Sequence, residues 1–192
     1  MRKRAEDRQR EIVDAVLRLA VAVGPDRLTT QAVADAVGIT QPAVFRHFPT
    51  RAALWLAVAR DVAARVRACW DEAAQPTGDP LADVRRLAIA QLGVIAGEPS
   101  ILAIVFSHEL RVADPALASV FRELMGDILR RLNDRFATAA ETLTVPPGDA
   151  ALLVLGLLQG LALRWSLAGR GFALTREGER LLDLQLAGLV RS

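Results

Sequence analysis

The sequence has few of the residues from which enzyme sites are built. It has one cysteine and two histidines in 192 residues. A lone Cys69 excludes an intramolecular disulfide framework and a cysteine metal cluster, and a small buried hydrophobe is its simplest interpretation. His47 and His108 stand far apart, without a Ser-His-Asp order, metal-ligand spacing or glycine-rich phosphate loop. We therefore expect no enzyme activity, no metal site and no cofactor.

Signals for strands, secretion and membrane insertion are also missing. Tyrosine is absent, and no alternating run of β-branched residues occurs. The N-terminal MRKRAEDRQR lacks the apolar core of a signal peptide. The uncharged run from Ala150 to Leu163 stops at Arg164, short of the roughly 20 residues that a membrane span needs. We expect a cytoplasmic protein with no membrane partner.

The sequence does contain the material for a sizeable core, because 52% of its residues are hydrophobic. Its net charge of +2 is unevenly distributed. Residues 1–51 hold nine Lys and Arg against six Asp and Glu, whereas the remainder holds fifteen against sixteen. A mild basic bias over the first quarter suits a surface that faces phosphates.

Apolar residues recur at three- and four-residue spacing between short Pro- and Gly-containing clusters, which predicts an all-α fold of about nine helices. Residues 75–80 (QPTGDP) form the clearest linker. The predicted helices cover residues 8–23, 29–37, 40–48, 51–74, 81–96, 100–112, 115–143, 149–167 and 175–190.

The stretch from Thr29 to Arg51 has the pattern of a helix-turn-helix. Thr29 is a hydroxyl N-cap for the first helix, and Gly38 supplies the left-handed backbone that ends it. Thr40 then caps a second helix that carries Pro42 in its first turn. A helix of about eight residues is unstable alone, so the rest of the chain must hold it. In such motifs the second helix reads the DNA major groove.

The same residues resemble the N-terminal domain of TetR-type transcriptional regulators. The resemblance is carried by IVDAVLRL, Gly24, LTT, AVADAVGI, QPAVFRHF and TRAAL, over about residues 8–60. It implies a bacterial homodimer with a DNA-binding domain at 6–66, whose motif is 29–48. A larger ligand-binding and dimerisation domain would occupy residues 67–192. It also implies repression relieved by a small molecule.

The resemblance places functional residues on this sequence. Base contacts fall on Gln31, Gln41, Pro42, Ala43 and Arg46, and phosphate contacts on Thr30, Phe45, His47 and Arg51. Side-chain chemistry agrees, because Gln pairs with adenine, Arg with guanine, and an Ala methyl meets a thymine methyl. Three residues depart from the family pattern. Phe45 replaces a usual Tyr and lacks its hydroxyl, Ala20 replaces a common Phe, and Arg51 replaces a usual Lys.

Residues 149–167 are apolar around the whole helix circumference, so this helix must be covered on every side. We expect it to form a four-helix dimer interface with the last helix of each chain. The alternative is that both helices are central in a monomer. The expected interface residues are Leu153, Leu157, Leu161, Leu182, Leu186 and Leu189.

The second domain is expected to hold a pocket for a largely apolar ligand, because apolar and aromatic walls with a few polar groups are typical of such sites. Plain core packing is the alternative for each member. The candidates are Val66, Trp70, Leu92, Phe106, Phe121, Met125, Gln159 and Trp165.

The sequence therefore predicts a homodimeric repressor that binds a palindromic operator in double-stranded DNA and is released by a small molecule. The rival hypothesis is a ligand-binding or sequestering helical protein that no longer binds a specific operator. The absence of any acid between Gln41 and Arg51 favours the first.

Overall fold

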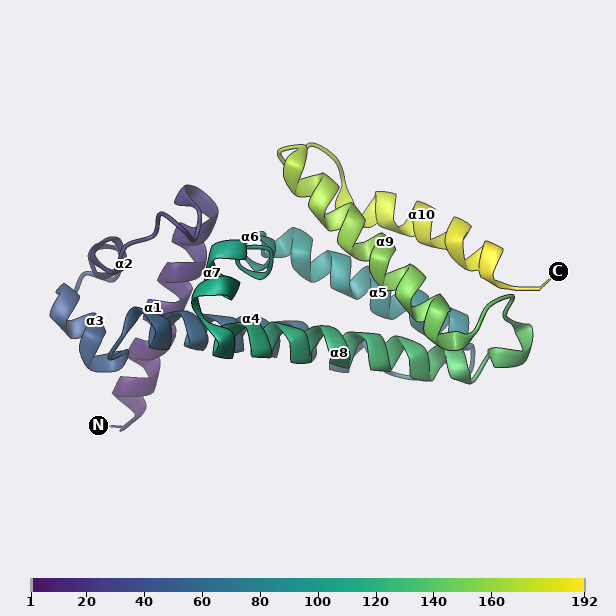
Figure 1. The fold of residues 1–192 in the computed structure, drawn as a ribbon, viewed down its shortest axis with the longest axis horizontal. Helices are drawn as coiled ribbons and strands as arrows, with labels where there is room; N and C mark the ends of the chain where they lie inside the picture. Colours follow the sequence, from purple (N-terminus) through teal and green to yellow (C-terminus); the bar gives the residue numbers. More distant parts are fainter. Residues whose placement is uncertain (1, 192) are drawn as a thin grey trace. The chain divides into compact units, whose positions relative to one another are not determined.

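A computed structural model describes residues 2–191, with side chains from residue 5 onward, and in this range the fold is all-α (Figure 1). Outside the helices it contains one isolated antiparallel bridge, between Leu143 and Val190. The helices are α1 (Arg2–Val23), α2 (Thr30–Val37), α3 (Gln41–His47), α4 (Arg51–Ala73), α5 (Pro80–Gly97), α6 (Ser100–Val105), α7 (His108–Ala113), α8 (Pro115–Ala137), a 3₁₀ turn η1 (Ala140–Thr142), α9 (Pro147–Leu167) and α10 (Leu174–Leu189).

The expected helix at 100–112 is two helices, α6 and α7, because Ser107 interrupts it. Its backbone is extended, and its Oγ accepts from the Leu110 backbone N–H at 3.2 Å. This N-cap starts a new helix instead of continuing the old one. The Ser107 hydroxyl also donates to Asp26 at 2.9 Å, a partner 81 positions away that helical periodicity cannot reveal. The expected helix at 115–143 ends earlier, at Ala137, where η1 follows.

The chain divides into two compact units. Unit 1 comprises the chain up to Ala64 together with Pro99–Arg122, and unit 2 comprises Arg65–Glu98 and the chain from Glu123 onward. Helices α4 and α8 each continue from unit 1 into unit 2. The division lies close to the predicted boundary at residue 66, but it assigns α6 and α7 to the unit of the helix-turn-helix. Packing of α6 on α1 is one reason for this.

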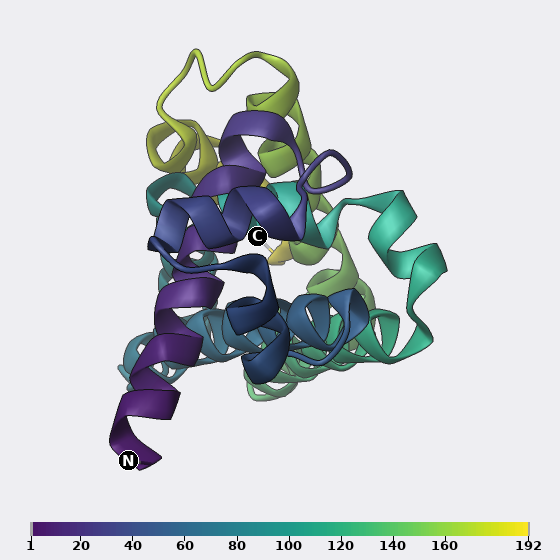
Figure 2. The same cartoon turned by 90° about the vertical axis from the view of Figure 1, so that its left-hand side faces the viewer.

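Unit 1 is organised around α1. Figure 2 shows α2 and α3 on the viewer's side of this helix, and both contact it. The shared core consists of side chains that are less than 8% exposed, and burying each such aliphatic or aromatic group contributes about 1.5–3 kcal/mol. Its main members are Ile12, Val16, Leu28, Val33, Val44, Phe48, Leu54 and Val58. The short helices α2 and α3 are thus stabilised by packing, since their own length is insufficient.

In unit 2, the second halves of α4 and α8 lie side by side and parallel. Arg67 pairs with Asp127 at 2.9 Å, and one turn further along both helices Asp71 pairs with Arg131 at 2.6 Å. Beyond them the Arg135 guanidinium donates to the Ala74 carbonyl at 2.9 Å. These three contacts keep α4 and α8 in register, although each exposed ion pair alone contributes little to stability.

The remaining helices of unit 2, α5, α9 and α10, contact one another pairwise. At Gly178 of α10 an added Cβ atom would clash with Leu92 Cδ1 of α5. Any larger residue at this position would force the Leu92 side chain to move. At the edge of the same pair, Arg85 of α5 binds Asp183 of α10 at 2.7 Å.

Two polar groups are buried in unit 2 with their partners. The Trp70 indole N–H donates to Gln91 Oε1 at 2.5 Å. Burial by itself raises the pKa of Asp83, but donors from the Thr77 hydroxyl and backbone N–H, with the Arg86 and Arg135 charges, outweigh it and leave the pKa below its ordinary value. Buried polar groups with satisfied hydrogen bonds fix local geometry without a large loss of stability.

Helix α9 has an apolar face that unit 2 leaves uncovered. Leu152, Leu153, Leu163 and Leu167 are exposed, as is Leu184 of α10, which runs antiparallel beside it (Figure 1). By length and composition α9 could also cross a membrane, a test that the core helix of a folded protein passes as well.

The expected interface residues are only partly on this face. Leu153 is exposed and Leu157 is half-buried, whereas the other four are buried in the protomer's own core. Helical spacing defines stripes without saying which stripe faces inward, and a helix that is apolar all round offers no polar side to decide it. The four are Leu161, Leu182, Leu186 and Leu189.

Candidate nucleic-acid interface

Helix α2 begins and ends as its sequence dictates. The Thr29 side chain accepts from the Ala32 backbone N–H at 3.1 Å. At the other end Gly38 has φ 72°, and the Ile39 N–H returns to the Ala34 carbonyl at 3.0 Å. A residue with a Cβ atom adopts this left-handed backbone only with strain, so Gly38 makes the tight turn into α3 possible.

Helix α3 is anchored by its inner face. Val44 is buried, and the backbone carbonyl of His47 accepts from Gln9 Nε2 of α1 at 3.3 Å. Pro42 occupies the first turn, where no intrahelical N–H donor is needed. These contacts hold a seven-residue helix rigid enough to present a defined outer surface.

The outer face of α3 presents three exposed residues, Pro42 and, three and four positions after it, Phe45 and Arg46. Arg46 and His47 fall in the last turn, where a helix dipole favours positive charge. No carboxylate occurs on α3 or in the segment that follows it as far as Arg51. This face combines a guanidinium, an aromatic ring and no acid, which suits an anionic polymer.

Gln41 and Thr30 are joined in the free protein. Gln41 Nε2 donates to Thr30 Oγ1 at 2.7 Å, linking α3 to the start of α2. An amide nitrogen carries two hydrogens and a hydroxyl can donate as well as accept. Gln41 therefore keeps one N–H and its carbonyl oxygen for a base edge, and Thr30 keeps its O–H for a phosphate.

Two of the predicted contacts need correction. Ala43 is only 8% exposed beside the buried Val44, so little of its methyl is available to a thymine. Phe45 is 37% exposed and reaches solvent, but its ring has no hydrogen-bonding group for a phosphate. It can instead contact the apolar surface of a sugar or a thymine methyl.

The other predicted contacts lie at the surface. Gln31 is exposed and donates to Asp35 Oδ1 at 2.7 Å, which leaves its carbonyl oxygen available. Arg51 is exposed in the first turn of α4, a helix that starts with the Thr50 hydroxyl accepting from the Ala53 N–H at 3.0 Å.

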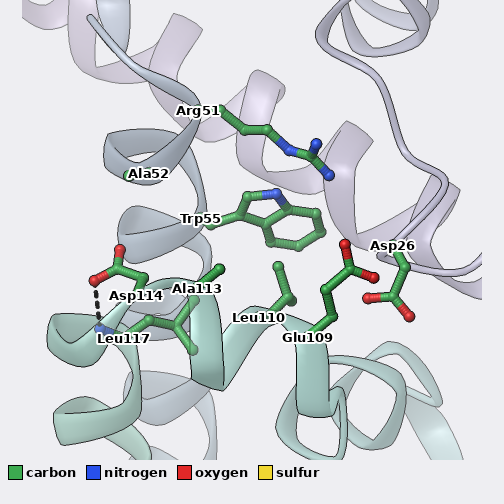
Figure 3. Close-up of a pocket in the computed structure, with 9 residues that line it drawn as sticks. All are labelled: Asp26, Arg51, Ala52, Trp55, Glu109, Leu110, Ala113, Asp114 and Leu117. Carbon is green, nitrogen blue, oxygen red and sulfur yellow. Dashed lines mark hydrogen bonds between the residues drawn. The ribbon is translucent and has the colours of Figure 1, made fainter.

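Arg51 also lines a cavity of about 170 Å³ that no sequence motif predicts (Figure 3). The lining comes from the turn after α1, the start of α4 and the α7–α8 segment, which are far apart in the chain. Neither motif nor spacing connects these segments, so only the folded unit reveals the cavity.

The predicted ligand-pocket residues fall in both units. Phe106 and Phe121 belong to unit 1 and the other six to unit 2. Within unit 2, Gln159 Nε2 and Met125 Sδ meet at 3.5 Å, and the Trp165 indole donates to the Phe172 carbonyl at 2.9 Å. Val66, Trp70 and Leu92 are fully buried. That this set forms one pocket stays a prediction.

Comparison with known proteins supports the resemblance. Residues 12–58 match the family described as "Bacterial regulatory proteins, tetR family". No curated protein matches the chain.

Several solved structures share the fold over nearly the whole chain. NalD of Pseudomonas aeruginosa, described as the secondary repressor of the MexAB-OprM multidrug efflux pump, is 22% identical, with 98% of each chain covered and a TM-score of 0.75. A transcriptional regulator from Rhodococcus sp. is 22% identical, with 94% of this chain and 95% of that chain covered and a TM-score of 0.80. FadR of Bacillus subtilis, solved with stearoyl-CoA, is 15% identical, with coverage of 93% and 98% and a TM-score of 0.76.

Residues 12–58 of this chain therefore match the TetR family, and the whole chain has the fold of these solved structures.

Proposed function

We propose that this TetR-family chain is a homodimeric repressor that a small molecule releases from a palindromic operator. The observation that carries the proposal is the outer face of α3, held by a capped, glycine-turned α2 and free of acidic groups. A surface helix without a DNA-binding role gains nothing from excluding carboxylates, whereas a helix that approaches phosphates does.

We assign base readout to Gln41 and Arg46. Arg46 would pair with a guanine, and the free N–H and carbonyl of Gln41 with an adenine. Thr30 orients Gln41 by accepting its other N–H, and its own hydroxyl donates to a phosphate. Arg51 and His47 would add sequence-independent phosphate contacts, while Phe45 packs against sugar or thymine.

We assign the dimer to the uncovered apolar face on α9 and α10. It carries five exposed leucines, and burying them against a second copy would remove a large apolar area from water. A two-fold axis through this face brings together the same surface patch of both copies. Each dimer then presents two α3 helices, which we call its readers. The readers would enter major grooves about 34–36 Å apart, one helical turn of DNA.

Release by a ligand requires two states of the dimer with different ligand affinities. Helix α4 is the element that we expect to couple them, because it starts beside the reader and continues without a break into unit 2. A ligand that binds better to one α4 orientation would change the separation of the two readers. A ligand-responsive repressor agrees with two proteins of the same fold, the pump repressor NalD and FadR, which was solved with stearoyl-CoA.

Selection of bound sequences from a random double-stranded DNA library tests operator binding. We expect a palindrome whose half-site centres lie 10–11 base pairs, or a multiple, apart. Arg46→Ala should abolish enrichment at one position of each half-site. Arg176→Ala, an exposed arginine on α10, is the control for charge and should leave the selected sequence unchanged. If no sequence is enriched, the rival function as a ligand-binding protein gains support.

Spin labels on α3 test the release mechanism. Once a releasing ligand is found, we expect the label-to-label distance across the dimer to change when the ligand is added to the free protein. An unchanged distance together with loss of DNA binding would refute the role of α4 while leaving the repressor assignment intact.

A further inference from the structure

Helix α2 carries an exposed carboxylate at a position that helix polarity and DNA both disfavour. Thr30 at the start of α2 contacts Gln41 at the start of the reader helix α3, so the two helices adjoin at these ends. The carboxylate belongs to Asp35, in the last turn of α2. Negative charge is unfavourable at the C-terminal end of a helix and weakens the attraction of a surface for phosphates. Neither helix stability nor nonspecific affinity for DNA therefore accounts for Asp35.

Asp35 has a hydrogen-bond partner on the same face of α2, one turn earlier. Gln31, for which the sequence predicts a base contact, donates from Nε2 to Asp35 Oδ1 at 2.7 Å, and both side chains are exposed. A pair four positions apart on an open helix surface adds little to stability. Its larger effect is on the orientation of the Gln31 amide.

A carboxylate decides which end of an amide turns toward it. An ionised carboxylate only accepts hydrogen bonds, whereas an amide has a donating NH₂ group and an accepting oxygen. If the Gln31 amide were reversed, its oxygen would meet Asp35 Oδ1, and two acceptors would repel each other. Asp35 thus holds the NH₂ group, and the carbonyl oxygen of Gln31 is left for a donor on the DNA.

The four bases differ in whether they offer such a donor in the major groove. Adenine and cytosine present an amino group there, whereas guanine O6 and thymine O4 are acceptors. A carbonyl oxygen is complementary to the first two bases and repelled by the other two. The second N–H of Gln31 can meet a purine N7, but adenine and guanine share that atom, so it does not remove the discrimination by the amino group.

We infer that Asp35 is a positioning residue for base readout, which turns the Gln31 oxygen toward the DNA so that Gln31 selects adenine or cytosine in each half-site. The inference rests on the proposed operator binding and specifies one base of the operator. Reversing that base pair would move the amino group to the opposite strand and place an acceptor before Gln31. We expect a preference of roughly tenfold for adenine or cytosine over guanine or thymine, within the range of one specific base contact.

Enrichment from a random DNA library, followed by fluorescence anisotropy on operators that differ at one base pair, tests this with the full chain. Gln31→Met, which keeps the length of the side chain without its amide, identifies the contacted position as the one whose preference it removes. Asp35→Asn replaces an acceptor by a group that both donates and accepts, so the Gln31 amide can adopt either orientation. The preference should then fall from roughly tenfold to about twofold or less, while affinity for random DNA rises.

Two controls separate positioning from charge and from stability. Asp7→Asn removes the same charge from an exposed site of α1 and should leave the base preference unchanged. Asp35→Asn combined with Gln31→Met should alter no base preference beyond that of Gln31→Met alone, because the amide that Asp35 positions is then absent.

Three results would overturn the inference and leave the repressor proposal intact. These are a preference for guanine or thymine at the position of Gln31, an unchanged preference in Asp35→Asn, and an operator whose preferences Gln31→Met does not alter. If the unmodified protein enriches no sequence, the repressor proposal fails and the inference fails with it.

Discussion

The outer face of α3 and the outer face of α9 are both left open by the fold, yet their chemistry is opposite. The first is a seven-residue helix with a guanidinium, an amide and no acid, and the second is a 21-residue helix whose exposed face is mostly leucine. A polar face free of acids suits phosphates and base edges, whereas a leucine face suits only another apolar surface. On this difference rests our proposal that DNA binds one face and a second copy the other.

The strongest way to break this assignment is a charge in the leucine face. Leu163→Glu places two unpaired carboxylates in the proposed interface, at a cost of roughly 3–5 kcal/mol, or at least about 100-fold in the dimer dissociation constant. Analytical ultracentrifugation should find monomers. Val112→Glu, at an exposed valine of α7, should remain dimeric. A dimeric Leu163→Glu protein would move the interface to another surface.

The reader face is tested by two arginines with different proposed roles. Arg46→Ala should weaken operator binding by about 1–3 kcal/mol and relax preference at one base pair of each half-site. Arg51→Ala should weaken operator and random DNA alike and reduce the salt dependence. Fluorescence anisotropy on both DNAs at several salt concentrations measures this. The same loss of specificity in both variants would contradict the division between base and phosphate contacts.

The packing of α10 on α5 depends on Gly178. Gly178→Ala places a methyl in a clash with Leu92 Cδ1, and the repacking this forces should lower the free energy of unfolding by about 1–3 kcal/mol. Gly126→Ala, on α8 with no atom within 4 Å of the new methyl, should instead stabilise by about 0.5–1 kcal/mol. Urea unfolding followed by circular dichroism compares them. Equal effects would mean that α10 packs less closely on α5.

The smallest expected effect concerns Phe45. Phe45→Tyr adds a hydroxyl at the end of the ring, and a new phosphate hydrogen bond should tighten DNA binding by about 0.5–1.5 kcal/mol without altering base preference. Anisotropy with operator and random DNA is again the measurement. A change of preference at one base pair would show that Phe45 contacts a base and not the backbone.

Local features were predictable from the sequence because local chemistry causes them. The Thr29 cap, the left-handed Gly38 and the proline in the first turn of α3 each act within a few residues and are confirmed, whereas Thr40 precedes α3 without the expected side-chain cap hydrogen bond. The all-α class followed from three- and four-residue spacing. That spacing also gave most helix limits, but it missed Ser107, whose cap and long-range bond to Asp26 divide one expected helix into two.

Only the tertiary structure decided which side of a helix faces inward and which distant segments meet. Ala43 shares the outer-looking pattern of α3 yet packs against the core, and Leu182 belongs to a leucine stripe that unit 2 buries within itself. The cavity beside Trp55 unites segments that no periodicity links. Burial is a property of neighbours in space, and those neighbours are set by the packing of whole helices, which a one-dimensional pattern does not contain.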